Sequence, residues 1–124
     1  MARHDTKLLD RRVVPKGQEI FREGAQALCA YFVESGEVEI YLTVRESEGK
    51  TRQVLGRVGQ GGIFGEMGLV DDEPRMASAR TSEDSVLVLV GREAFRQKLA
   101  KADPFIRGLL TIFARNIRAL TRSR

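Results

Sequence analysis

Short β-branched or aromatic runs, separated by glycine and polar turns, follow one another from about residue 11 to residue 91. This pattern is typical of strands joined by tight turns, so it predicts a β structure for this part of the chain. Residues 37–45 alternate between apolar and polar, and we interpret 30–34 and 37–45 as a hairpin with one buried face. The predicted strands lie at residues 13–14, 19–21, 30–34, 37–45, 51–58, 63–64, 76–81 and 85–90. The residues expected in the core are Val38, Ile40, Leu42, Val86, Val88 and Val90.

The spacing of apolar residues changes after Gly91. Phe95 and Leu99 lie four apart, as on one face of a helix, and Asp103 and Pro104 form an N-cap followed by proline at the first helical position. The apolar residues of this second helix recur at spacings of three and four and are Ile106, Leu109, Leu110, Phe113, Ile117 and Leu120. The sequence therefore predicts a mainly β fold with C-terminal α-helices, arranged as a small β-barrel or jelly roll.

The chain length and charge suggest one domain with a basic end. With 124 residues, 42% of them hydrophobic, the chain is long enough for one compact core. We divide it into a flexible N-terminus at 1–10, a barrel with its first helix at 11–102, and a basic amphipathic helix at 103–124. Residues 92–124 hold 9 Lys or Arg against 2 Asp or Glu. We interpret this excess as a solvated helix face in preference to a nucleic-acid or membrane site.

Several function classes are disfavoured by what the chain contains. The lone Cys29 excludes an intrachain disulfide and a CxxC metal site, and the single histidine, His4, lies in the expected flexible N-terminus. A catalytic triad or a zinc site is therefore disfavoured, and we expect no enzyme, metal or cofactor. No apolar stretch approaches the ~18 residues of a membrane span, and the polar start does not resemble a signal peptide, so we expect a cytoplasmic protein.

The segment from residue 61 to residue 78 carries the most chemistry. A strand ends at Phe64, the backbone turns at Gly65, and one helical turn can follow, which leaves N–H groups free to hold an anion. Arg75 can offer a planar fork to a phosphate, whereas the acceptor-only carboxylate of Glu66 suits a sugar hydroxyl. Together they indicate a ribose phosphate. The glycines fit neither G-x-G-x-x-G nor a P-loop. The alternative is an ion pair between Glu66 and Arg75 beside a solvated acidic loop, whose residues are Asp71, Asp72 and Glu73.

The run Phe-Gly-Glu-Met-Gly-Leu at 64–69, followed by Pro74 and Arg75, resembles the phosphate-binding cassette of the cyclic nucleotide-binding domain family. Bacterial cAMP receptor proteins, regulatory subunits of cAMP-dependent protein kinase and nucleotide-gated channels share that cassette. The similarity covers about residues 11–100. It implies a cupin-like jelly-roll β-barrel with a short cassette helix and two C-terminal helices. By the same resemblance Glu66 takes the ribose 2′-hydroxyl, Arg75 takes the cyclic phosphate, and the ligand-binding residues are Gly65, Glu66, Met67, Gly68, Arg75, Met76 and Ala77.

One residue departs from the resemblance. Several family members place Ser, Thr or Ala after the arginine, and a hydroxyl there is associated with guanine recognition, whereas this chain has Met76. The departure favours cAMP over cGMP. Ser78 is a weak substitute, because it lies ~6 to 7 Å further along the strand. Side chains near Val54 and Val58 are candidates for the base pocket.

We therefore expect a non-enzymatic, stand-alone sensor that binds cAMP, with cGMP as the less favoured ligand. We expect it to act through its C-terminal helices or through an unidentified downstream protein. We expect no DNA-binding helix-turn-helix after the last helix of this sequence. The apolar stripe of that helix is interpreted as a homodimer seam or as a lid over the base. Two alternatives remain: a barrel that has lost its ligand, hinted at by Met76, and a nucleic-acid or anionic-surface binder using Arg107, Arg115, Arg118, Arg122 and Arg124.

Overall fold

The computed structural model of the chain describes residues 9–122. Its strands are β1 (Leu9–Val14), β2 (Glu19–Phe21), β3 (Cys29–Ser35), β4 (Glu37–Glu46), β5 (Gly49–Gly59), β6 (Ile63–Phe64), β7 (Ser78–Thr81) and β8 (Ser85–Gly91). Its helices are α2 (Met67–Asp71), α3 (Arg92–Ala100) and α4 (Pro104–Arg122). The flexible N-terminus expected at 1–10 falls largely outside the described residues, as does His4, and Leu9 and Asp10 already belong to β1.

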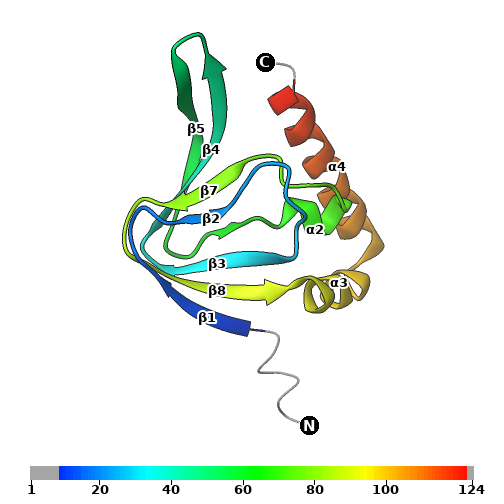
Figure 1. Cartoon of the computed structure of the whole chain (residues 1–124). Helices are drawn as coiled ribbons and strands as arrows, with labels where there is room; N and C mark the ends of the chain where they lie inside the picture. The colour runs from blue at the N-terminus through cyan, green and yellow to red at the C-terminus, as the bar shows by residue number, and fades with distance from the viewer. Residues whose placement is uncertain (1–8, 123–124) are drawn as a thin grey trace.

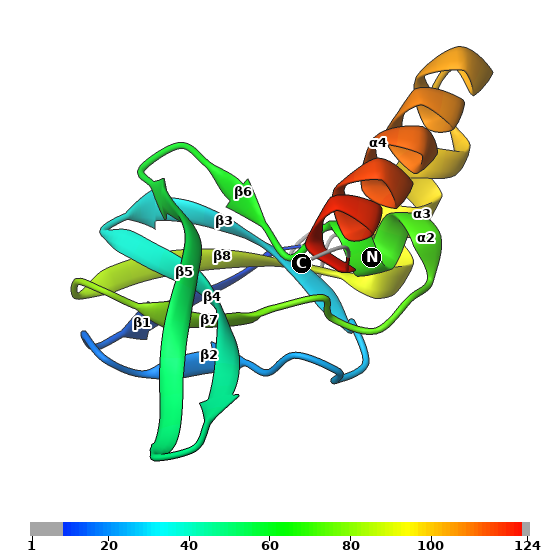
Figure 2. The same cartoon turned by 90° about the horizontal axis from the view of Figure 1, so that it is seen from above.

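Two four-stranded antiparallel sheets form a sandwich, with the strand orders β1-β8-β3-β6 and β2-β7-β4-β5 (Figures 1 and 2). The long hairpin of β4 and β5 extends beyond the sandwich, and the helices gather at one end of it (Figure 1). The predicted mainly β fold with C-terminal helices is confirmed. Within residues 9–122, no helix is long and apolar enough to cross a membrane.

The predicted hairpin between residues 30–34 and 37–45 is wrong. Strand β3 pairs with β8 and β6, whereas β4 pairs with β5 and β7, so the chain crosses from one sheet to the other at Gly36. Gly36 has a φ of 95°, and a Cβ there would lie 2.2 Å from Ser85 Oγ. A short turn and an alternating strand indicate a buried face, but they do not say which strands are neighbours.

The main core lies between the sheets and is made of Val14, Val33, Val38, Phe64, Ala79, Leu87 and Leu89. On β8 the prediction chose the wrong face: Leu87 and Leu89 are buried, and Val86, Val88 and Val90 are only half-buried. Every residue from 86 to 90 is apolar, so alternation could not identify the inner face.

On β4 the prediction holds for two of three residues. Val38 and Leu42 are buried, but the pairing with β5 shifts between Ile40 and Tyr41, and Ile40 is half-buried. The shift is a local irregularity of the kind that redirects a side chain. Ile40 consequently lines a cavity described below.

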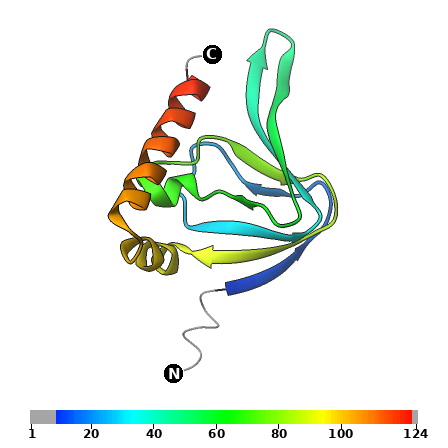
Figure 3. The same ribbon diagram turned by 180° about the vertical axis from the view of Figure 1, so that it is seen from behind.

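The helical end of the sandwich is organised around the short helix α2, which contacts both α3 and α4. Figure 3 shows this group from behind, with α4 running past α2. The predicted start of α4 is found: the carboxylate of Asp103 accepts a hydrogen bond from the backbone N–H of Phe105 at 2.8 Å. The strands and helices thus bring the loop from residue 61 to residue 78 against the C-terminal helix.

Candidate functional site

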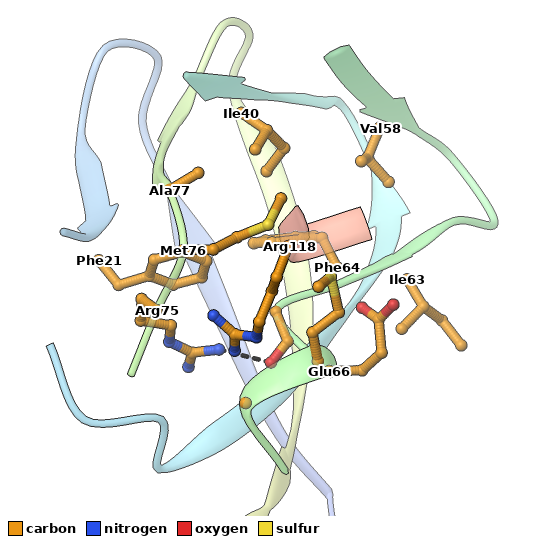
Figure 4. Close-up of a pocket in the computed structure, with 13 residues that line it drawn as sticks. Phe21, Ile40, Val58, Ile63, Phe64, Glu66, Arg75, Met76, Ala77 and Arg118 are labelled. Atoms are coloured by element: carbon orange, nitrogen blue, oxygen red, sulfur yellow. Dashed lines mark hydrogen bonds between the residues drawn. The ribbon is translucent and has the colours of Figure 1, made fainter. Parts of the chain in front are cut away.

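A cavity of about 200 Å³ opens where the turn after β6 meets β4, β5 and α4 (Figure 4). All of the residues predicted to bind a ligand line this cavity, and they are Gly65, Glu66, Met67, Gly68, Arg75, Met76 and Ala77. The wall is completed by Phe21, Ile40, Val58, Ile63, Phe64 and Arg118. The fold therefore assembles the predicted set in one place.

Two glycines shape the turn at the cavity. Gly65 has a φ of 77°, and a Cβ there would lie 2.9 Å from Nη1 of Arg75. At Gly68 a Cβ would lie 2.5 Å from the Cβ of Ala27, so the missing side chain lets α2 pack directly on the loop before β3. Gly65 is thus needed for the positive φ of the turn and for the close approach of Arg75, whereas Gly68 is needed for the packing of α2 against Ala27.

Arg75 is the central cation of the site and is only 6% exposed. Its Nη1 donates to the carbonyl oxygen of Gly65, and its Nη2 donates to that of Cys29 at 2.7 Å. The guanidinium carbon lies 4.0 Å from the ring centroid of Phe21, close enough for a cation–π contact. Burial lowers the pKa of this guanidinium.

The Nε atom of Arg75 is buried and finds no hydrogen-bond partner among the described residues. Buried polar groups in native proteins are nearly always hydrogen-bonded, so an unpaired buried N–H calls for an explanation. Arg75 also lines the cavity, so an acceptor bound there can reach this guanidinium group. A phosphate oxygen is such an acceptor, and a guanidinium binds it strongly.

Glu66 precedes α2 and is half-buried in the cavity wall. Burial raises the pKa of its carboxyl, and the positive charge of Arg75 opposes this effect. No ion pair joins Glu66 to Arg75 within the part of the chain that the structure describes. Since Arg75 donates to backbone carbonyls instead, the alternative of a Glu66–Arg75 pair is wrong, and both groups remain available to a ligand.

The acidic loop is not simply solvated. Asp71, the last residue of α2, accepts hydrogen bonds from Nε of Arg118 at 2.5 Å and from its Nη2 at 3.2 Å. Asp72 has a φ of 60° and pairs with Arg92 and Arg96 of α3. The hydrogen bond and charge of Arg92 lower the pKa of Asp72. The end of α2 is therefore tied to both C-terminal helices.

Arg118 is the site residue that the sequence analysis missed. It was assigned to a solvated helix face, but it is only 6% exposed and lines the cavity. A signal was present: Arg118 follows Ala114 by four residues and precedes Thr121 by three, so the three share one face of α4. The small Ala114, which is buried, allows that face to approach α2.

The rest of the cavity wall is apolar. Ile40, Val58 and Ile63 come from three strands and face the cavity together with Met76 (Figure 4). A flat, largely apolar group such as a nucleobase suits this wall. Of the two valines predicted nearby, Val58 lines the cavity, whereas Val54 is 40% exposed on the hairpin.

Residues 11–102 match the sequence profile of a family described as the cyclic nucleotide-binding domain. The chain belongs to the cyclic nucleotide-binding domain family. It is 33% identical over 108 residues to the cyclic AMP receptor protein of Thermus thermophilus, and the aligned region covers 87% of this chain and 49% of that protein. It is 32% identical over 99 residues to a cAMP-dependent protein kinase regulatory subunit of Emericella nidulans, covering 80% of this chain and 23% of that protein.

Solved structures share the fold of this cyclic nucleotide-binding domain. The cAMP-bound form of the EAL enzyme Bd1971 superposes with a TM-score of 0.79 and 34% identity, covering 90% of this chain and 29% of that one. Its cGMP-bound form superposes with a TM-score of 0.81 and 35% identity, and the match covers 92% of this chain and 30% of that one. The chain thus spans about half or less of the length of these relatives.

Two remaining features bear on the chemistry of the cyclic nucleotide-binding domain. The Ser78 hydroxyl, the weak candidate for a ligand contact, accepts a hydrogen bond from the backbone N–H of Glu23 at 2.9 Å and does not line the cavity. Among residues 9–122, no group of three or more His, Cys, Asp or Glu side chains is placed to hold a metal ion.

Proposed function

We propose that this chain binds a cyclic nucleotide, cAMP in preference to cGMP, and acts as a sensor module and not as an enzyme. The observation that carries the proposal is Arg75, a buried guanidinium that lines the cavity and has an unpaired N–H group. Glu66, on the same cavity, supplies an acceptor for a sugar hydroxyl. A cyclic phosphate fused to a ribose is the ligand that presents both groups together.

The preference for cAMP rests on the base side of the cavity. Met76 follows the arginine and brings no hydroxyl, and the neighbouring wall is made of Ile40, Val58 and Ile63. These side chains offer van der Waals contact to a purine ring but no hydrogen bond to a guanine edge. The similar enzyme Bd1971 has been solved with cAMP and with cGMP, so cGMP is the second ligand to test.

The output of the sensor is proposed to pass through α2. The turn at Gly65 and Glu66, which we call the cradle, lies at one end of this five-residue helix, and the ion pairs of Asp71 and Asp72 with α4 and α3 lie at the other. A ligand that stabilises the cradle therefore also stabilises the docked position of the C-terminal helices, from which a downstream protein or a second copy of the chain can be engaged.

The basic-surface alternative is weakened by the same contacts. Arg118, one of the arginines it relies on, is buried against Asp71 and is not offered to solvent. Arg107 is half-buried and donates to the carbonyl of Ala100, which leaves Arg115 as the exposed arginine of this set within the described side chains. A nucleic-acid surface requires several exposed cations, each contacting a phosphate.

Calorimetric titration with cAMP and with cGMP tests the proposal, together with thermal melting. A ligand that binds only the folded state stabilises it by ~2.7 kcal/mol at a hundredfold excess over Kd. We expect a clear rise in melting temperature with cAMP and a smaller one with cGMP. No shift with either ligand at millimolar concentration would overturn the proposed function.

Amide hydrogen exchange tests the output. We expect cAMP to slow exchange in the turn at residues 65–71 and also in α4, because Asp71 joins the two. Slower exchange confined to the turn would contradict the proposed route and would assign the output to another surface.

A further inference from the structure

Two guanidinium groups line the cavity, but the proposed function uses only that of Arg75. The second belongs to Arg118, which reaches the cavity from α4. In Figure 4 its guanidinium group is directed away from Ile40 and Val58 and toward the side of the cavity where Arg75 and Glu66 are drawn. Its ion-pair partner, Asp71, is the last residue of α2, at the opposite end of this short helix from the turn at Gly65. The guanidinium of Arg118 therefore faces the polar side of the cavity, opposite the apolar wall.

The hydrogen bonds of Arg118 leave half of the guanidinium available. Asp71 accepts from Nε and from one N–H of Nη2, and these are the hydrogen bonds that the structure gives to this side chain within residues 9–122. A guanidinium carries five N–H donors in a fixed plane. The fork formed by Nη1 and the second N–H of Nη2 thus remains, in a side chain that is 6% exposed. A bidentate fork of this kind matches the oxygens of a phosphate.

We propose that Arg118 is a second phosphate-binding residue, which holds the ligand through its Nη1/Nη2 fork while Asp71 holds its Nε edge as a positioning residue. The proposal rests on the proposed function and extends it. It assigns the contact of α4 to the phosphate, the part that all cyclic nucleotides share, and not to the base. Both ends of the Arg118 guanidinium are then occupied when the ligand is bound, by Asp71 and by the phosphate.

Calorimetry with two ligands separates a phosphate contact from a base contact. The ligands cAMP and cGMP have the same ribose and phosphate, but the base edges differ, because adenine presents an amino donor where guanine presents a carbonyl acceptor. An arginine only donates, so a contact to the 6-position of the base would distinguish the two ligands, whereas a contact to the phosphate would not. We expect Arg118→Met to weaken both ligands by the same factor, about tenfold to a hundredfold.

Arg115→Met is the matched control, because it removes the same charge from an exposed position on the same helix. We expect it to change either affinity less than twofold. Since Arg118→Met leaves Asp71 buried without its partner, the double variant Asp71→Asn/Arg118→Met removes both charges and guards against a folding defect. We expect the double variant to lose as much affinity as Arg118→Met.

The variant Asp71→Asn tests whether Asp71 positions the Arg118 guanidinium. Asp72→Asn is the control, because it removes the same charge from a residue that pairs with α3 instead of α4. We expect Asp71→Asn to weaken the binding of both ligands severalfold in the wild-type background. It should have no effect on binding when Arg118 is already methionine. A merely structural role of Asp71 would not produce this coupling.

The possible failures are distinct. Tighter binding of the ligands by Asp71→Asn would overturn the proposal that Asp71 and the phosphate bind Arg118 at the same time. It would mean that Asp71 competes with the ligand for Arg118. A loss in Arg118→Met that is larger for cGMP would assign this side chain to the base. A loss no greater than that of Arg115→Met would remove it from the site. Each of these outcomes leaves the proposed function intact, whereas a wild-type chain that binds neither ligand overturns the proposed function and this inference together.

Discussion

The guanidinium carbon of Arg75 lies 4.0 Å from the ring centroid of Phe21, while the backbone carbonyls of Gly65 and Cys29 accept hydrogen bonds from its two terminal nitrogens. The side chain is thereby fixed by a ring, by the turn after β6 and by the first residue of β3 before any ligand arrives. A fixed guanidinium loses little conformational freedom on binding, which is the physical basis of preorganised recognition. Arg75 is therefore the position at which substitution is most informative.

Arg75→Lys is expected to weaken cAMP binding by about tenfold to a hundredfold, equivalent to ~1.5 to 3 kcal/mol. Lysine retains the charge but loses the planar fork and the stacking on Phe21. Calorimetry measures the change. Arg80→Lys is the control, since Arg80 lies on the neighbouring strand β7 and does not line the cavity. Equal affinity of the wild type and Arg75→Lys would place the phosphate elsewhere.

Glu66 is expected to discriminate the ribose. If its carboxylate accepts the 2′-hydroxyl, 2′-deoxy-cAMP binds the wild type more weakly than cAMP does, and Glu66→Gln reduces the difference because a charge-assisted hydrogen bond is lost. The measurement is the difference between the two ligands in each protein. A difference that is unchanged in Glu66→Gln would remove Glu66 from the ribose.

The same carboxyl is expected to make binding depend on pH. Burial raises the pKa of Glu66, so it becomes protonated at a higher pH than an exposed glutamate. The affinity for cAMP should therefore fall as the pH is lowered through this raised pKa, since the acceptor carboxylate is lost while the phosphate stays ionised. Titrations across mildly acidic pH check this, with the exposed Glu73 as control: Glu73→Gln keeps the wild-type pH profile and Glu66→Gln flattens it.

The part of the site that could be predicted from the sequence consists of residues that are close to one another along the chain. Gly65, Glu66 and Arg75 lie within one turn and loop, so their spacing alone limits how far apart they can be. Arg118 was missed because its role depends on α4 docking against α2, which brings Asp71 and Arg118 together from 47 positions apart in the chain. The small Ala114 on the same helix face was a local sign of packing, but the charge of Arg118 by itself describes a solvated face equally well.

The fold shows the same division between local and distant information. Strand positions could be predicted because runs such as residues 37–45 alternate, but the pairing of β3 with β8 joins Phe32 to Val88, which are far apart in the sequence. On β8, five apolar residues follow one another, so either face could be the buried one, and the pairing register with β1 and β3 decides that Leu87 and Leu89 point inward.

Gly68→Ala is expected to destabilise the fold by ~1 to 3 kcal/mol, because the added methyl would lie 2.5 Å from the Cβ of Ala27 and 2.8 Å from the carbonyl oxygen of Glu73. The control is Gly108→Ala in α4, where nothing lies within 4 Å and alanine favours the helix by ~1 kcal/mol. Thermal or urea unfolding should therefore show opposite signs for the two variants. A neutral Gly68→Ala would mean that α2 can shift away from Ala27 without loss.

The last prediction concerns the outer face of α4. Ile106, Leu110, Phe113, Ile117 and Leu120 are exposed, and their spacings of 4, 3, 4 and 3 residues follow the repeat of a coiled-coil seam. The side of the helix with Ala114 and Arg118 contacts the domain in this structure, so the exposed stripe lies on another side of α4, and a second copy of α4 is the partner that this repeat fits.

We therefore expect the chain to self-associate, with a mass that rises from one chain to two as its concentration increases in sedimentation experiments. Phe113→Glu should shift the equilibrium to the monomer by placing a charge in the centre of the seam. Ile112→Glu should not, because Ile112 is equally exposed but lies ~100° away around the helix. A wild-type chain that remains monomeric at high concentration, or equal effects of the two variants, would contradict a dimer through this face and leave it for a different protein.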